Sequence, residues 1–115
     1  MNTLRNRVQL IGNLGNDPEI KELESGKKMA RFSIATNDAY RNADGQKITT
    51  TQWHNIIAWN GNALIAENYL KKGREVAIEG RLAHRTYDDK DGNTKYITEV
   101  IVNQILLLSN GGKEN

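Results

Sequence analysis

The two tryptophans of the chain, Trp53 and Trp59, are the side chains best suited to bind a flat ligand. Side chains of a strand alternate between its faces, so a strand over residues 52–60 places both tryptophans on one face with Asn55 and Ile57. At about 3.3 Å per residue, roughly 20 Å separates the indoles. This spacing favours two flat contacts along an extended ligand, although buried tryptophans often simply pack in a core.

Cations and aromatic side chains share other positions that we expect to face outward. Arg81, Arg85 and Tyr87 fall on one face of a predicted strand, and Tyr40 adjoins Arg41 in a predicted loop. Proteins bind single-stranded nucleic acid with this mixture, because bases stack on aromatic rings while cations follow the phosphates. A single surface cation is usually just solvated. The evidence for binding is therefore that cations and aromatic side chains lie on the same strand faces. The candidate phosphate contacts are Arg5, Arg7, Arg31, Arg41, Lys72, Arg81 and Arg85.

Catalytic patterns are missing from the sequence. His54 and His84 lie in different predicted strands without metal-ligand spacing, and the chain has no cysteine for a disulfide, a thiolate metal site or a nucleophile. Residues 12–15 (GNLG) contain two glycines but lack the Gly-Lys-Ser/Thr of a phosphate loop. The aspartates of residues 88–91 lack the further ligands of a calcium loop and suit a charged hairpin tip. We therefore expect no enzyme, no metal and no cofactor.

The composition limits the number of domains, the kind of partner and the cellular compartment that the sequence allows. A chain of 115 residues with 37% hydrophobic residues predicts one domain with a modest core. The formal net charge of +2 does not by itself indicate a nucleic-acid partner. Any such prediction has to rest on where the cations lie. No apolar run approaches the roughly 20 residues of a membrane span, and no signal-peptide core follows the N-terminus. These features fit a protein of the reducing cytoplasm.

The elements that would position these residues are mostly strands. Alternation predicts strands over residues 5–14, 28–36, 52–60, 74–87 and 96–108, a short extended piece at 19–23, and one helix over 63–72. Residues 37–49 read as a long polar loop, functional or mobile, with an Asp-Gly turn signal at 44–45. One helix between the third and fourth of five strands predicts an all-β, five-stranded oligonucleotide-binding barrel. We expect it to span residues 1–108, followed by a short flexible tail over 109–115.

Five ordered blocks resemble bacterial and bacteriophage single-stranded DNA-binding proteins: residues 9–19 (QLIGNLGNDPE), 32–37 (FSIATN), 52–55 (QWHN), 69–73 (YLKKG) and 76–82 (VAIEGRL). The resemblance implies the same barrel, usually a homotetramer with a dimer as the alternative, wrapped by single-stranded DNA. The stacking aromatics of that family fall on Tyr40, Trp53, Trp59 and Tyr87, and His54 matches a position at a subunit interface.

The resemblance also suggests a biological role. It implies sequence-independent binding and protection of single strands during DNA replication, recombination and repair, in the nucleoid-associated cytoplasm. Relatives usually continue into a flexible linker with an acidic tip that recruits other proteins, whereas this sequence ends in GGKEN, so we expect only weak recruitment of replication and repair proteins.

Two other interpretations stay open. One is a dimeric primosome-restart adaptor of the same fold, which would bind helicase partners as well as single strands. The other is a nuclease or another enzyme that acts on DNA, which would need a cluster of carboxylates or histidines across strands that the sequence does not show.

Overall fold

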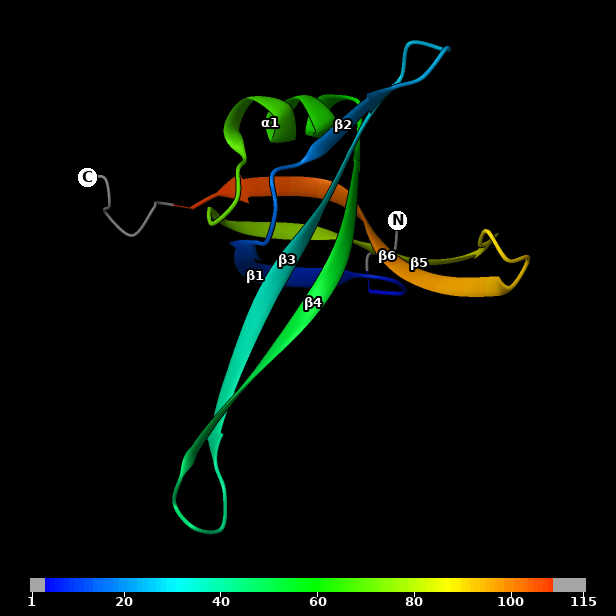
Figure 1. The fold of residues 1–115 in the computed structure, drawn as a ribbon. Coiled ribbons are helices and arrows are strands. Elements are labelled where there is room, and N and C mark those ends of the chain that lie inside the picture. The colour runs from blue at the N-terminus through cyan, green and yellow to red at the C-terminus, as the bar shows by residue number, and fades with distance from the viewer. Residues whose placement is uncertain (1–3, 109–115) are drawn as a thin grey trace.

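The computed structural model describes residues 4–108, so the predicted tail at 109–115 lies outside the described residues. The strands follow one another around a closed barrel in the order β1-β5-β6-β4-β3, and β3 returns to pair with β1 (Figure 1). This arrangement confirms the predicted five-stranded barrel, and the short edge strand β2 is added beside β3. The elements are β1 (Val8–Leu14), β2 (Glu19–Glu22), β3 (Lys28–Arg41), β4 (Lys47–Trp59), α1 (Gly61–Tyr69), β5 (Glu75–Asp88) and β6 (Thr94–Leu107).

The core follows the alternation of the long strands. Every second residue of β3 is buried across Ala30, Phe32 and Ile34. In β4 the core residues are Ile56 and Ala58, and Ile57 between them is buried as well, at 4% exposure. The helix packs against β3, β4 and β6. Its two buried alanines join the core cluster, so the small side chains let α1 lie close to the barrel. Among residues 4–108, no helix is long and apolar enough to cross a membrane.

Two hairpins extend beyond the barrel as arms, one formed by residues 37–51 of β3 and β4 and the other by residues 84–98 of β5 and β6 (Figure 1). The prediction of a long loop over residues 37–49 is wrong, because β3 continues to Arg41 and β4 begins at Lys47. An arm with solvent on both faces needs no apolar alternation, so the sequence pattern that marks a half-buried strand is missing there. The cross-strand bond from Thr51 Oγ1 to Asn37 Oδ1, 2.8 Å long, illustrates the polar pairing.

Both arms end in five-residue loops with the same internal hydrogen bonds. In the first loop Asn42 Oδ1 accepts bonds from the backbone N–H groups of Asp44 and Gln46, at 2.9 and 3.0 Å. In the second, Asp89 Oδ1 accepts the corresponding bonds from Asp91 and Asn93, both 2.9 Å long. Gly45 takes a positive φ of 78°, as the Asp-Gly signal predicts. These side-chain bonds hold both loops, including the first, which lies in the segment that the sequence predicted to be functional or mobile.

Candidate nucleic-acid interface

The face of β3 and β4 turned away from the core, here called the tryptophan face, carries Trp53, Asn55, Ile57 and Trp59 as predicted, although Ile57 is buried there by its neighbours. Antiparallel register places Trp53 opposite Ala35 and Trp59 opposite Met29. The Trp53 side chain is 61% exposed, whereas Trp59 is half-buried. Such exposure of a large aromatic ring is not what a core position requires, so the structure favours the binding interpretation over packing for Trp53.

A glycine lies beneath the Trp53 indole. A Cβ built at Gly15 would collide with Cζ3 of Trp53 and come within 2.9 Å of Ser33 Oγ. The segment is fixed from both sides, because Gly15 N–H donates to Ser33 O at 3.0 Å and Asn16 Oδ1 accepts from Ser33 Oγ at 2.8 Å. Residue 15 therefore has to lack a side chain for the ring to lie where it does. Sequence reasoning considered Gly15 as part of a rejected phosphate-loop pattern and missed this role.

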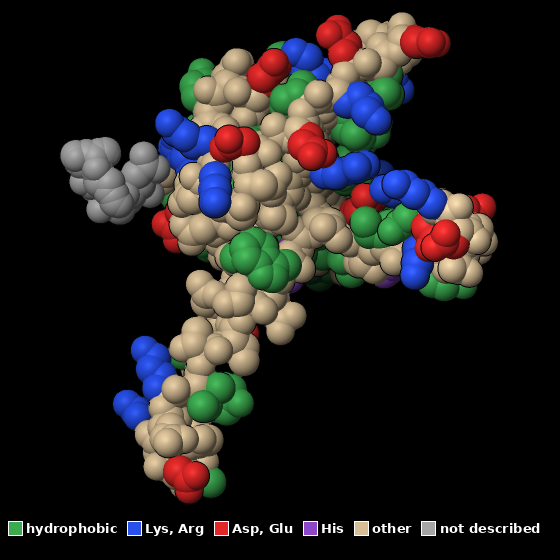
Figure 2. Space-filling model, in the orientation of Figure 1, with side chains coloured by type: hydrophobic (Ala, Val, Ile, Leu, Met, Phe, Trp, Pro, Cys, Tyr) green, Lys and Arg blue, Asp and Glu red, His purple; other side chains and the backbone are tan. Residues whose placement is uncertain are grey.

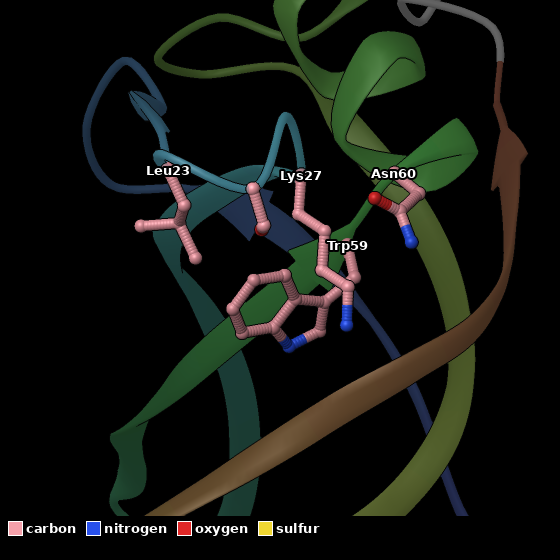
Figure 3. Close-up of a pocket in the computed structure, with 5 residues that line it drawn as sticks. Leu23, Lys27, Trp59 and Asn60 are labelled. Atoms are coloured by element: carbon pink, nitrogen blue, oxygen red, sulfur yellow. The ribbon is translucent and has the colours of Figure 1, made fainter.

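The second indole borders a hollow of about 400 Å³. Trp59 forms one side, and the turn between β2 and β3 supplies the opposite side through Leu23, Ser25 and Lys27 (Figure 3). Asn60 lies on its rim. Sequence reasoning did not select Lys27, because the turn that brings it to Trp59 is distant from the tryptophan strand in the sequence.

Two arginines flank an apolar strip beside the tryptophans. Register aligns Arg31 with Ile57, Ile57 with Ile101 of the parallel neighbour β6, and Ile101 with Arg81. Both arginines are exposed, and within residues 4–108 neither forms an ion pair. Three strand spacings of about 4.8 Å put their backbones roughly 14 Å apart. Free guanidinium groups at this spacing suit the phosphates of a strand that crosses the face.

Arg85 lies on the same face but is already paired. Its Nε and Nη2 donate to the two carboxylate oxygens of Glu99 at 3.0 and 2.9 Å. Glu99 is only 4% exposed, and these hydrogen bonds together with its negative charge raise the pKa of Arg85 above its usual value. Arg7 is also paired, with Nε 3.5 Å from Glu79 Oε2. A phosphate reaching Arg85 would compete with the buried carboxylate of Glu99, whereas one reaching Arg7 would compete with the longer, more exposed contact to Glu79.

The remaining predicted residues lie away from this row. Arg41 Nη1 donates to Gly45 O at 2.9 Å at the tip of the first arm, and Arg5 and Lys72 are exposed outside the strands. Tyr87, 46% exposed, shares the face of Arg81 and Arg85 but lies further along the second arm. Tyr40, 56% exposed, alternates onto the opposite side of β3 from the tryptophan face.

His54 has the opposite orientation to the tryptophans, as predicted. It lies across from Ile34, and its Nε2 is 2.9 Å from Thr36 Oγ1. Among residues 4–108, no three His, Cys, Asp or Glu side chains gather as metal ligands would. Figure 2 shows Lys and Arg side chains over the barrel and both arms, with Asp and Glu side chains between them. The cationic character is therefore local rather than a uniform positive surface.

Comparison with known proteins places this arrangement in a family. Residues 5–108 match the Single-strand binding protein family, which covers most of the chain. The chain belongs to the single-strand binding protein family. It is 45% identical over 111 residues to "Single-stranded DNA-binding protein 1" of Chlorobaculum tepidum, covering 96% of this chain and 67% of that protein. It is 40% identical over 110 residues to "Single-stranded DNA-binding protein" of Neisseria meningitidis, covering 96% of this chain and 63% of that protein.

A solved structure extends the likeness to the fold. The structure titled "Plasmodium falciparum SSB complex with ssDNA" matches with a TM-score of 0.82 and 35% identity, over 95% of this chain and all of that one. The predicted family and barrel are thus confirmed. Trp53, Trp59 and Arg31 share the tryptophan face and Arg81 lies beside it, whereas Arg7 and Arg85 are ion-paired and Tyr40 lies out on the first arm, on the other side of β3.

Proposed function

We propose that this protein binds single-stranded DNA without sequence preference and covers exposed strands during replication, recombination and repair. The observation that carries the proposal is the pair of outward-facing tryptophans on one strand with two unpaired arginines beside them. Membership of the single-strand binding protein family supports it, as does the structural relative titled as a complex with single-stranded DNA.

The chemistry of this face suits unpaired strands. An indole stacks on any base whose face is free, and each such contact is worth about 1–3 kcal/mol. Bases of a duplex already stack on one another, so their faces are not available. Every base has a flat face and every nucleotide a phosphate, which makes the recognition insensitive to sequence. Family membership also supports a protein that binds DNA without acting on it as an enzyme.

We further propose a homotetramer as the working assembly, located in the nucleoid-associated cytoplasm. Register aligns three apolar side chains, Ile11, Ala77 and Leu106, across the outward face of β1, β5 and β6. Ile11 is 53% and Leu106 58% exposed, and a second subunit could cover such a row. His54 is proposed to lie at a subunit contact because it faces away from the tryptophans. Mass measurement by light scattering would distinguish a tetramer from the dimer of a restart adaptor.

Titration of intrinsic fluorescence with oligo-dT tests the binding function. Stacking on bases should quench the emission of Trp53 and Trp59 strongly, and addition of salt should weaken binding. Unchanged emission at saturating oligo-dT, or equally tight binding of a duplex of the same length, would overturn the proposal.

A further inference from the structure

The hollow beside Trp59 is lined by Lys27, a cation that no carboxylate of the described residues neutralises. Lys27 is exposed and, within residues 4–108, forms no ion pair. We propose that this hollow holds one nucleotide of the bound strand, with its base on the Trp59 indole and its phosphate on the Lys27 ammonium. The inference rests on the proposed function and adds a residue and a location to it.

The neighbouring Lys28, the first residue of β3, provides a contrast, because its charge is paired within the protein. Lys28 Nζ lies 2.7 Å from Glu67 Oε1 on α1, and this hydrogen bond raises the pKa of Lys28. Glu22, which is opposite Lys28 in the register, adds a further negative charge on that side. Lys27, in the turn just before β3, instead lines the hollow with Trp59 and has no carboxylate partner among residues 4–108.

The turn holds Lys27 in place. Leu23 N–H donates to Lys27 O and Gly26 N–H donates to Leu23 O, both at 2.8 Å, so residues 23–27 are closed by two backbone bonds. Leu23 and Lys27 therefore face the indole from a fixed frame (Figure 3). The volume of about 400 Å³ falls within the roughly 300–1,000 Å³ of ordinary small-ligand sites. It can accommodate one nucleotide.

Asn60 on the rim supplies a second sign of a binding function. It adopts φ 53° and ψ −115°, and it is the one non-glycine residue with positive φ among residues 4–108. Its backbone is engaged, because its N–H donates to Lys28 O at 2.8 Å and its carbonyl accepts from Leu64 N–H at 3.0 Å. Its side chain makes no capping bond to α1. A strained residue with an uncommitted carboxamide beside an indole fits contact with a base edge, and an amide offers both a donor and an acceptor.

Salt dependence of oligo-dT binding tests the phosphate contact. The strand should be about 15 nucleotides long, the upper end for one barrel of this kind. Lys27→Gln should reduce the log–log salt slope by about 0.7, so that the wild-type protein loses about fivefold more affinity than the variant for each tenfold rise in salt. The matched control is Lys28→Gln combined with Glu67→Gln, which removes a neutralised pair and should leave the slope unchanged.

A double-mutant cycle tests whether the base and the phosphate belong to one nucleotide. The loss from Lys27→Gln should shrink when Trp59 is already alanine, and should persist when Trp53 is alanine instead. An unchanged salt slope for Lys27→Gln, or an equal loss in both backgrounds, would overturn the inference while oligo-dT binding itself stands. Failure of the unmodified protein to bind oligo-dT would instead overturn the proposed function.

Discussion

The two tryptophans have the same residue type, strand and face, yet their surroundings differ. Trp53 is 61% exposed and lies over Gly15, and the arginine on that part of the face, Arg85, is bound to the buried Glu99. Trp59 is half-buried beside a hollow, with Lys27 on its rim and Arg31 in the next outward-facing row. We call these two parts the Trp53 half (Gly15, Trp53 and Arg85) and the Trp59 half (Lys27, Arg31 and Trp59). The Trp53 half offers an aromatic ring for stacking with little free positive charge, whereas the Trp59 half combines stacking with unpaired cations.

This difference suggests that two sources of affinity are separated along the face. Stacking depends weakly on salt, while phosphate contacts release counterions and depend on it strongly. We expect substitutions in the Trp53 half to weaken binding by a similar factor at every salt concentration. Substitutions in the Trp59 half should change the salt slope as well.

The largest expected effect is that of Trp53→Ala. Removal of the exposed ring should weaken binding of oligo-dT by about 2–3 kcal/mol, the upper part of the range for one stacking contact. Because the side chain is mostly exposed, the thermal midpoint should change little. Binding isotherms at two salt concentrations would measure the effect, and a loss confined to low salt would contradict the assignment of Trp53 to stacking.

Arg85→Gln should act on stability more than on DNA. It leaves the carboxylate of Glu99, 4% exposed, without its two hydrogen bonds, which should lower the free energy of unfolding by about 1–2 kcal/mol. Denaturant titration would show this loss, and adding Glu99→Gln should recover part of it. A flattened salt slope with unchanged stability would mean that Arg85 is a free phosphate contact after all.

Gly15→Ala should weaken DNA binding at the Trp53 half although Trp53 itself is not substituted. The added Cβ would occupy the position of the ring, so the indole must move, and we expect a loss of about 1 kcal/mol in oligo-dT binding. Gly61→Ala is the matched control, since a Cβ there meets nothing within 4 Å. Equal affinity of the two variants would show that the placement of the Trp53 ring is unimportant.

The smallest expected effect is that of Arg81→Gln. Loss of one unpaired guanidinium should reduce the salt slope by about 0.7 and weaken binding mainly at low salt. The same change at Arg7, whose guanidinium already faces Glu79, should reduce the slope less. If both variants shift the slope equally, ion pairing on this surface does not decide which arginines reach phosphate.

The amino-acid sequence by itself determined the barrel, the single helix and the orientation of both tryptophans. The strands, the helix and the orientation of the tryptophans depend on patterns between residues close together along the chain, and the barrel was predicted from the position of the single helix in the order of the strands. The separation of His54 from the tryptophan face follows from the same alternation. The extent of the first arm could not be predicted, because a two-stranded arm with both faces in solvent carries no apolar pattern.

Tertiary structure alone decided which charges are free and what each indole touches. Arg85 meets Glu99 because the pairing of β5 with β6 shifts by one residue between Glu79 and Gly80, which sets the register beyond it. Gly15 reaches Trp53 because the sheet closes by pairing β1 with β3, and Lys27 reaches Trp59 because β3 pairs with β4 next to the turn that carries Lys27. Alternation fixes the face on which a side chain lies, but its neighbours across strands depend on register and closure, which the pattern of a single strand does not contain.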